Sequence, residues 1–223
     1  MPRGRSNSAP VSLAETATPS PMTTRGRRTR AALVTAAREA FEELGFRDAR
    51  ISDITERAGT SYGVFYHYFD SKESILHELF TVVTGEMYAA SQTSSGMTGS
   101  PIEKIRAANR QYLAVAARNA RLIATIEELA FREPQFRELK LRIREPFVRR
   151  NEIGIQRLQE RGLADPKLDA RTAASMLGGM IENFSMLWFV HGVDYDEALA
   201  VETLTSLWGH AIGLSAEDGG IDS

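Results

Sequence analysis

The 223-residue chain has no cysteine, and it has no long uninterrupted apolar run. The absence of cysteine excludes disulfide bonds, thiolate nucleophiles and cysteine-ligated zinc sites, and it suits a reducing compartment. The most apolar stretch, Ala173 to Val190, is interrupted by Glu182 and Asn183, which favours a buried helix over a membrane span. The polar N-terminus lacks the apolar core of a secretory signal. We therefore expect a cytoplasmic protein that does not associate with membranes.

Signatures of catalytic and metal sites are also scarce. The four histidines are not arranged in an H-E-x-x-H pair, and no P-loop is present. We predict a protein that is not an enzyme and that uses neither a metal nor a cofactor; a helical enzyme is a remote alternative. What the chain does have is an ordinary globular composition, with 43% hydrophobic and 25% charged residues.

Positive charge is concentrated at the N-terminus, although the whole chain carries a net charge of −2. Residues 1–30 contain six arginines and a single acid, Glu15, which gives this segment a net charge of +5. An acidic protein with one basic end can approach DNA with that end alone. We expect Arg27, Arg28 and Arg30 to contact phosphates or the minor groove. A tail whose charge only improves solubility is the alternative.

The segment 51–76 predicts two short helices joined by a tight turn, followed by a third helix. Gly59 stands where a helix can end with positive φ, and Ser61 can cap a second helix over residues 62–68. A glycine-containing turn between two short helices is typical of a helix-turn-helix unit. The second helix of such a unit lies in the major groove of DNA.

The second helix of this pair has the composition of a reading surface more than that of a core. Phe65 and Phe69 form its inward stripe, whereas Tyr62 and Tyr66 form a second stripe on a different face. Gly63 would weaken an ordinary helix by roughly 1 kcal/mol relative to Ala, but it suits a position where the backbone approaches another molecule. A small aromatic core with a tolerated glycine is the alternative interpretation.

Two sequence blocks carry a family resemblance. The first is Ala36-Ala-Arg-Glu-Ala-Phe-Glu-Glu-Leu-Gly-Phe46, which is similar to the family pattern Ala-x-x-Leu-Phe-x-x-x-Gly-Phe. The second is Ile54-Thr-Glu-Arg-Ala-Gly-Thr-Ser-Tyr-Gly-Val-Phe-Tyr-His-Tyr-Phe-Asp-Ser-Lys-Glu73, which is similar to Ile-x-x-Ala-Gly-Val-Ser-x-Gly-Thr-Leu-Tyr-x-Tyr-Phe-x-Ser-Lys-Glu. Residues 31–79 therefore resemble the DNA-binding domain of the TetR family of transcriptional regulators. The rest of the chain resembles the family only in its length and its helical pattern.

Three positions depart from the family pattern. Thr55 replaces a usual alanine, Val64 replaces a common threonine, and Arg50 replaces a capping serine or threonine. Losing that cap costs about 1 kcal/mol, but an arginine there can reach a phosphate. These changes bear on which operator is recognised, not on DNA binding itself.

The resemblance implies a homodimer that binds a pseudo-palindromic operator in double-stranded DNA, because a two-fold protein presents two recognition helices. The residues expected to contact DNA are Arg27, Arg28, Arg50, Ser52, Ser61, Tyr62, Gly63, Val64, Tyr66, His67 and Lys72. Of these, Tyr62, Gly63, Val64 and His67 are expected to face bases. The others are expected to hold the sugar-phosphate backbone.

Beyond the motif the hydrophobic spacing is helical throughout. The predicted helices cover residues 24–44, 71–90, 102–118, 120–132, 136–161, 169–191 and 195–213, with a kink or break at Pro146. The fold class is therefore all-α, with an N-terminal three-helix head and a C-terminal helical body. The predicted domains are a disordered arm (1–22), a helix-turn-helix domain (23–70), a connecting helix (71–90), an effector-binding and dimerisation domain (101–214) and a tail (215–223).

The last two predicted helices are apolar on more than one face, so each must be buried on more than one side. Two such helices from each of two chains can form a four-helix bundle, and TetR-like proteins dimerise in this way. The residues assigned to the dimer interface are Leu177, Ile181, Phe184, Trp188, Leu204, Leu207, Trp208 and Ala211. An ordinary monomeric core is the alternative.

The resemblance also implies a pocket for a small-molecule effector in the body. The residues assigned to it are Tyr112, Glu128, Phe131, Phe147, Asn151, Asn183 and Met186. Aromatic and methionine side chains with a few polar groups suit a hydrophobic or amphipathic ligand. We expect a repressor that such an effector releases from its operator. A DNA-binding regulator without an effector is the alternative.

Overall fold

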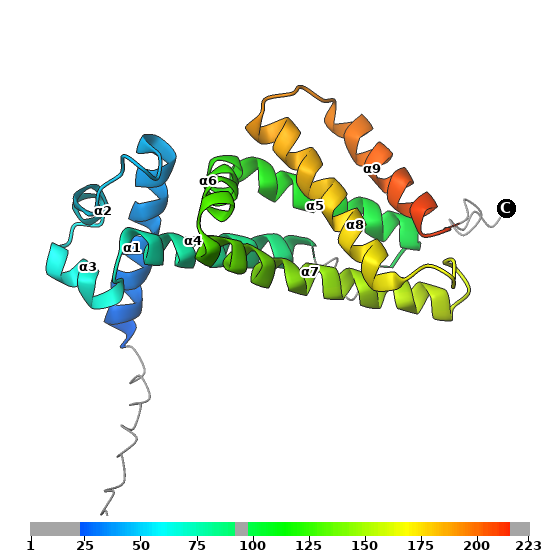
Figure 1. The fold of residues 1–223 in the computed structure, drawn as a ribbon, viewed down its shortest axis with the longest axis horizontal. Helices are drawn as coiled ribbons and strands as arrows, with labels where there is room; N and C mark the ends of the chain where they lie inside the picture. Colours follow the sequence, from blue (N-terminus) through cyan, green and yellow to red (C-terminus); the bar gives the residue numbers. More distant parts are fainter. Residues whose placement is uncertain (1–22, 92–97, 215–223) are drawn as a thin grey trace, which may run out of the picture.

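The structure, a computed structural model, describes residues 23–91 and 98–214. All regular elements in these ranges are helical: α1 (Thr24–Leu44), α2 (Ile51–Arg57), α3 (Tyr62–Tyr68), α4 (Lys72–Ser91), α5 (Pro101–Arg118), α6 (Ala120–Arg132), α7 (Pro134–Glu160), α8 (Ala170–Ser185), the π-helical turn η1 (Met186–Val190) and α9 (Glu197–Ala211). Figure 1 shows a head of α1, α2 and α3 beside a larger body of α5 to α9, with α4 running from one into the other. The predicted arm (1–22) and tail (215–223) lie outside the described residues.

The ends of the head helices follow local chemistry. The Thr23 hydroxyl accepts from the Gly26 amide at 3.1 Å and caps α1. Gly45 ends the same helix with a φ of 77°, a conformation that residues with a β-carbon rarely adopt. At the start of α4, the Ser71 hydroxyl accepts from the Ser74 amide at 3.2 Å. The predicted bounds of α1 and α3 are therefore confirmed to the residue.

The body helices that differ most from their predicted bounds are α7, α8 and α9. α7 begins at Pro134, because proline fits the first turn of a helix. Of the kink or break predicted at Pro146, the break is wrong, since α7 continues past this residue as one helix (Figure 1). α7 packs along much of its length against α8, α6 and α4, and these contacts hold it together across the one backbone donor that Pro146 lacks. The predicted helix 169–191 ends as an α-helix at Ser185 and continues as η1, and α9 is shorter than predicted at both ends.

One hydrophobic core extends from the head into the body. Leu33 of α1, Phe65 of α3 and Leu76 of α4 belong to the same buried cluster as Ile126 of α6 and Leu139 of α7. Two further clusters lie between α5, α7, α8 and α9. α4 therefore does more than connect two parts, because its apolar side chains complete the interior of both.

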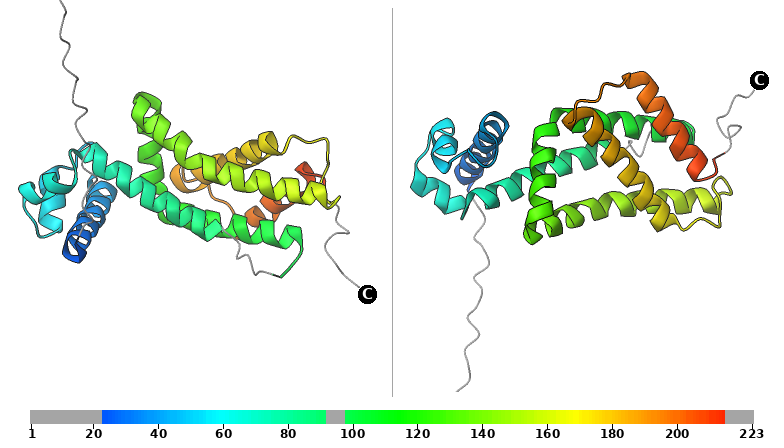
Figure 2. Two further views of the ribbon diagram at one scale, coloured as in Figure 1. Left: turned by 90° about the horizontal axis from the view of Figure 1, so that it is seen from below. Right: turned by 45° about the horizontal axis from the view of Figure 1, so that its top comes forward.

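Polar contacts add to the attachment of the head. α6 lies on the side of the body that faces the head in all three views (Figures 1 and 2). The Arg38 guanidinium of α1 donates to the Oδ1 atom of the buried Asn119, between α5 and α6, at 2.7 Å. The Arg47 side chain, just after α1, pairs with Glu128 of α6. The head is thus held to the body by α4 and by the corner between α5 and α6.

Candidate nucleic-acid interface

The turn between α2 and α3 is held by backbone and side-chain hydrogen bonds. Gly59 adopts a left-handed φ of 60°, and the Thr60 amide donates to the Thr55 carbonyl at 2.9 Å. The buried Thr55 hydroxyl donates to the Ser52 carbonyl at 3.0 Å, so this departure from the family pattern leaves no unsatisfied hydroxyl. Ser61 caps α3 with its hydroxyl. The predicted helix-turn-helix geometry is confirmed.

The letters Gly59-Thr-Ser-Tyr-Gly63 also match the G-x-S-x-G pattern of hydrolase nucleophile turns. In those enzymes the serine sits on a sharp turn between a strand and a helix. Here the turn joins two helices, and the Ser61 hydroxyl accepts from the Val64 amide. The match therefore carries no nucleophile.

α3 directs aromatic side chains to both of its sides. Phe65 and Phe69 are buried in the head, with ring centroids 5.9 Å apart. Tyr62 and Tyr66 lie outside the core and expose 50% and 53% of their surface. Gly63 between them is also exposed. The core therefore fixes one face of α3, while a polar and aromatic face is presented to solvent.

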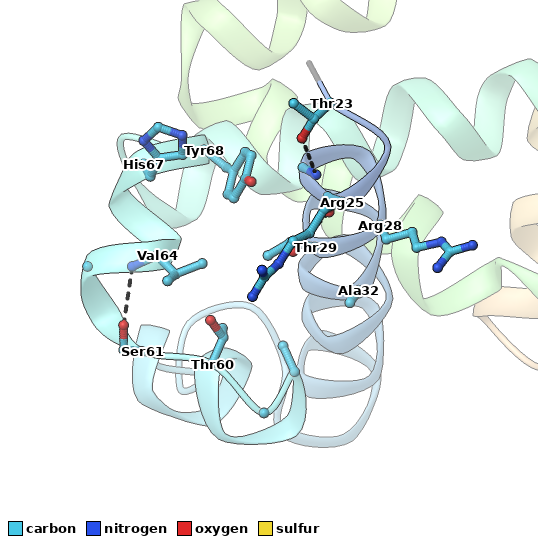
Figure 3. Close-up of a pocket in the computed structure, with 14 residues that line it drawn as sticks. Thr23, Arg25, Arg28, Thr29, Ala32, Thr60, Ser61, Val64, His67 and Tyr68 are labelled. Atoms are coloured by element: carbon cyan, nitrogen blue, oxygen red, sulfur yellow. Dashed lines mark hydrogen bonds between the residues drawn. The ribbon is translucent and has the colours of Figure 1, made fainter.

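A groove of about 870 Å³ separates α3 from the first turn of α1 (Figure 3). Five of the residues that the sequence analysis assigns to DNA contact line this one surface: Arg28, Ser61, Gly63, Val64 and His67. Arg25, which was not assigned, lines it as well. The lining residues include no acid, so the groove carries a positive charge that suits an anionic partner.

The arginines of α1 have different surroundings. Arg30 pairs with Glu78 of α4 and lies 4.9 Å from the centre of the Phe69 ring. The hydrogen bond between Arg30 and Glu78 raises the pKa of the Arg30 guanidinium and lowers the pKa of the Glu78 carboxyl. The Arg27 side chain donates to the Thr24 hydroxyl at 3.2 Å. The expectation that Arg30 contacts DNA is therefore corrected, since Arg30 joins α1 to α4.

The N-terminus of α2 provides two further expected contacts. The Arg50 side chain is exposed, and Ser52 in the first turn is half-buried. The Arg50 backbone amide donates to Asp53 Oδ2 at 2.7 Å. Asp53 thus satisfies the backbone at the position where the side-chain cap is missing, and the Arg50 guanidinium extends into solvent.

Lys72 has a different role from the predicted phosphate contact. Its ammonium donates to the carbonyl oxygens of Phe46, Arg47 and Ala49 at 2.5, 3.0 and 2.9 Å. It also lies 4.6 Å from the centre of the Phe46 ring. A lysine has three N–H donors, and all three are engaged here. Lys72 therefore holds the segment between α1 and α2 against the start of α4.

The residues assigned to an effector pocket are not gathered at one place. Tyr112 is half-buried and packs against two core clusters, and Phe147, Asn151 and Met186 are also half-buried. In contrast, Phe131 exposes 90% of its surface, Asn183 is exposed on α8, and Glu128 pairs with Arg47 of the head. The assignment of Glu128, Phe131 and Asn183 to an enclosed pocket is therefore wrong. Their sequence positions next to apolar residues do not reveal which side of the helix faces inward.

A polar cluster in the body was not predicted in full. The Arg144 guanidinium of α7 donates to both carboxylate oxygens of Glu182 at 3.1 Å and to the Ser175 carbonyl at 2.8 Å. Burial raises the pKa of the Glu182 carboxyl and of the Tyr112 phenol nearby. Lys140, one helical turn before Arg144, pairs with Glu127. The sequence signal for this cluster was the spacing of Lys140 and Arg144, which share one face of a basic helix.

The expected dimer residues divide into two groups. Leu177, Ile181, Leu204 and Trp208 are buried inside the protomer, so their assignment to an interface between chains is wrong. Phe184 and Trp188 are half-buried and contact the Tyr195 ring, with centroids 4.8 and 5.9 Å away. Leu207 and Ala211 are exposed. The large exposed apolar side chains on α8, η1 and α9 are Met176, Leu187, Leu199 and Leu207.

Two further findings concern residues 23–91 and 98–214. In these ranges no group of three or more histidine, cysteine, aspartate or glutamate side chains is placed to hold a metal ion. No helix within them is both long enough and apolar enough to cross a membrane.

Known proteins match the head alone or most of the chain. Residues 33–79 match the family described as bacterial regulatory proteins, tetR family. The uncharacterized HTH-type transcriptional regulator YdgC of Bacillus subtilis is 27% identical over 190 residues, which cover 83% of this chain and 94% of YdgC. The fatty acid metabolism regulator protein of Bacillus subtilis is 27% identical over 171 residues, which cover 74% and 85% of the two chains.

Solved structures share the fold. FadR from Bacillus subtilis in complex with stearoyl-CoA aligns with a TM-score of 0.71 at 23% identity, covering 82% of this chain and 98% of FadR. The fatty acid degradation regulator FadR from Bacillus halodurans aligns with the same TM-score at 22% identity, covering 81% and 94%. These alignments cover most of the chain, so both solved structures share the all-α arrangement of a head and a body.

Proposed function

We propose that this chain, which belongs to the TetR family of DNA-binding transcriptional regulators, is a repressor that a small amphipathic effector releases from its operator. The observation that carries the DNA-reading part is the exposed face of α3, which borders a groove lined by arginines and hydroxyls and by no acid. An enzymatic function is set aside because the family and the curated relatives are transcriptional regulators.

The proposed contacts follow from the position of each side chain. The exposed Tyr62, Gly63 and His67, together with the half-buried Val64, face bases in the major groove. The phosphate contacts are made by the exposed or half-buried residues Arg27, Arg28, Arg50, Ser52, Ser61 and Tyr66. Lys72 acts indirectly, because its ammonium is engaged by backbone carbonyls.

Gly63 provides a test in which stability and DNA binding should change in opposite directions. A β-carbon at Gly63 would meet only the Ser61 Oγ atom at 3.9 Å, which is an ordinary contact. Gly63→Ala should therefore raise the free energy of unfolding by up to about 1 kcal/mol, since alanine favours a helix. The same methyl group would intrude where the backbone approaches DNA, and operator affinity should fall roughly tenfold.

The Gly63 experiment uses an operator selected from a pool of randomised duplexes, with affinity measured by fluorescence anisotropy and stability by urea unfolding. Gly85→Ala is the matched control, because Gly85 lies on α4 with no atom within 4 Å of its added β-carbon. That control should gain stability and keep its affinity. If Gly63→Ala binds the operator as tightly as the wild type, the exposed face of α3 does not read DNA.

A homodimer is proposed from the apolar surface that α8, η1 and α9 leave uncovered. Leu199 and Leu207 lie two helical turns apart on α9 and expose 68% and 50% of their surface. Met176 on α8 and Leu187 on η1 are also exposed, at 72% and 37% of their surface. A large exposed apolar patch is a usual sign of an interface, and a two-fold contact here would present two heads to a pseudo-palindrome.

For the effector we propose a long-chain acyl-CoA or a related acidic lipid. One of the two 27% identical relatives is a fatty acid metabolism regulator protein, and FadR, which has a similar fold, has been solved in complex with stearoyl-CoA. In the body, Tyr112 and Phe189 pack against the same core clusters, and Tyr112 interacts electrostatically with the pair of Arg144 and Glu182. Apolar walls with a few polar groups suit an amphipathic molecule. Because α4 contributes to the same core as α6 and α7, a ligand that displaces these helices would also move the head.

Reciprocal binding tests the proposed release from DNA. A ligand that weakens operator binding tenfold must itself bind tenfold more weakly in the presence of operator, which is a coupling of about 1.4 kcal/mol. Calorimetric titration of stearoyl-CoA with and without operator should give this difference, with coenzyme A as the control that lacks the acyl chain. Equal affinities in the two titrations would contradict release by this ligand.

The competing proposal is a DNA-binding regulator without an effector. It becomes the better interpretation if neither acyl-CoA thioesters nor a broad set of metabolites shifts the melting temperature of the protein. Ligand binding to the native state must raise that temperature, by an amount that grows with ligand concentration.

A further inference from the structure

The groove between α1 and α3 contains an arginine that crosses it. Figure 3 shows the Arg25 side chain extending from α1 towards Thr60 and Val64 on the opposite wall. Arg28, one turn later, extends away from α3 in the same view. The first turn of α1 therefore contributes one guanidinium to the interior of the groove, and that guanidinium belongs to Arg25.

The surroundings of Arg25 favour an anionic ligand. Within the described ranges, no carboxylate lies within 4.0 Å of its guanidinium. Arg30, in contrast, is occupied by Glu78. The opposite wall presents the hydroxyl groups of Thr60 and Ser61. An arginine that faces hydroxyl groups across a groove without acids matches the needs of a phosphodiester, which accepts hydrogen bonds and carries one negative charge.

Both walls of the groove are held in place. On α1, the Thr29 hydroxyl donates to the Arg25 carbonyl at 3.1 Å, and Thr23 caps the first turn. On the other side, the Thr60 amide donates to the Thr55 carbonyl. The Ser61 oxygen accepts from a backbone amide, so its own O–H is left to donate to a ligand. These bonds hold the shape of each wall, and the spacing between the walls is set by the core cluster that α1 and α3 share.

We propose that Arg25, with the Thr60 and Ser61 hydroxyls across from it, holds one phosphate of the operator backbone inside this groove. The contact fixes how deeply α3 enters the major groove, because the phosphate is held between α1 and the N-terminal end of α3. This inference rests on the proposed operator binding, and it assigns the central phosphate contact to Arg25 in preference to Arg28 or Lys72.

The first experiment measures operator affinity against salt concentration for Arg25→Gln and for Arg110→Gln. Arg110 is an exposed arginine on α5, and its substitution removes the same charge away from the groove. Arg25→Gln should bind about tenfold more weakly, and the slope of log K against log salt should decrease by about 0.9 per half-site. Arg110→Gln should keep the wild-type slope. The melting temperature should be unchanged in both variants, because both side chains are exposed.

The second experiment locates the phosphate. Operators that carry one uncharged methylphosphonate at successive positions are titrated with the wild type, with Arg25→Gln and with Thr60→Val. At one position per half-site the wild type should lose about tenfold in affinity, and Arg25→Gln should lose nothing further. Thr60→Val, which removes the hydroxyl and keeps the shape, should show a smaller loss at the same position.

The two possible failures give different results. If Arg25→Gln keeps the wild-type salt slope, or if its loss adds to that of every methylphosphonate, the proposed phosphate contact of Arg25 is wrong although the protein still binds its operator. If the wild-type protein selects no operator at all, the proposed function has failed and the phosphate contact of Arg25 fails with it.

Discussion

Substituting Lys72 by methionine should lower the free energy of unfolding of the protein by about 2–3 kcal/mol, although Lys72 lies in a motif associated with DNA binding. Methionine keeps the apolar stem but removes the ammonium that three carbonyl oxygens share. Two of those hydrogen bonds, to Phe46 and Ala49, are partly buried, so water replaces the ammonium there incompletely. Urea unfolding followed by circular dichroism gives the measurement.

Lys72→Arg separates a structural role from a phosphate contact. Arginine keeps the positive charge, and it would preserve contact with a phosphate on the outside of the head. Its planar guanidinium cannot direct donors at three converging carbonyls as an ammonium does. We therefore expect Lys72→Arg to lose most of the stability that Lys72→Met loses. If Lys72→Arg instead keeps full stability and binds the operator more weakly, Lys72 contacts DNA and does not act through the fold.

Leu207→Glu should convert the proposed dimer to a monomer and weaken operator binding at least about 100-fold. The substitution puts a carboxylate into an apolar contact that two-fold symmetry repeats, and burying an unpaired charge costs several kcal/mol. A monomer also loses the gain that comes from engaging both half-sites at once. Sedimentation velocity reports the mass, and anisotropy with a full operator reports the affinity.

Leu141→Glu is the control for the dimer experiment. Leu141 lies on α7 and not on α8, η1 or α9, and it exposes 61% of its surface. It should leave the mass and operator affinity unchanged. A dimeric Leu207→Glu protein would show that the exposed faces of α8 and α9 are not the contact, and a monomeric Leu141→Glu protein would transfer the interface to α7.

The helix ends of the head could be predicted because they depend on adjacent residues. Thr23 and Gly45 delimit α1, and Gly59 and Ser61 separate α2 from α3, through turns and caps that span a few positions. The inward stripe of α3 could be predicted for the same reason, since the spacing of Phe65 and Phe69 follows the helical period.

The roles of basic residues in the head could not be predicted, because they depend on distant partners. Arg30 is paired with Glu78, 48 positions later in the chain. Lys72 is bound by carbonyls that lie 23 to 26 positions earlier. Both residues stand among arginines and lysines that look alike in sequence, and only the packing of α4 against α1 distinguishes them from Arg25.

The contact faces of the body could not be predicted from apolarity alone. α8 and α9 are apolar on two sides, and the sequence does not state which side meets the protomer and which meets another molecule. The stripe that includes Leu177 and Trp208 fills the protomer, whereas Met176 and Leu207 remain outside. Phe131 shows the same limit, because a helix position next to buried residues can still point into solvent.

The continuous core around α4 limits how heads can be exchanged between regulators. Phe65 shares its buried cluster with Ile75 and Leu76, which lie after the end of the helix-turn-helix unit. A chimera joined at residue 70 would give the head a foreign α4 and would replace part of its interior. A junction placed after Val83, together with Asn119 and Glu128 as the partners of Arg38 and Arg47, would transfer a head that keeps its own packing. Operator preference is therefore portable only with about half of the connecting helix attached.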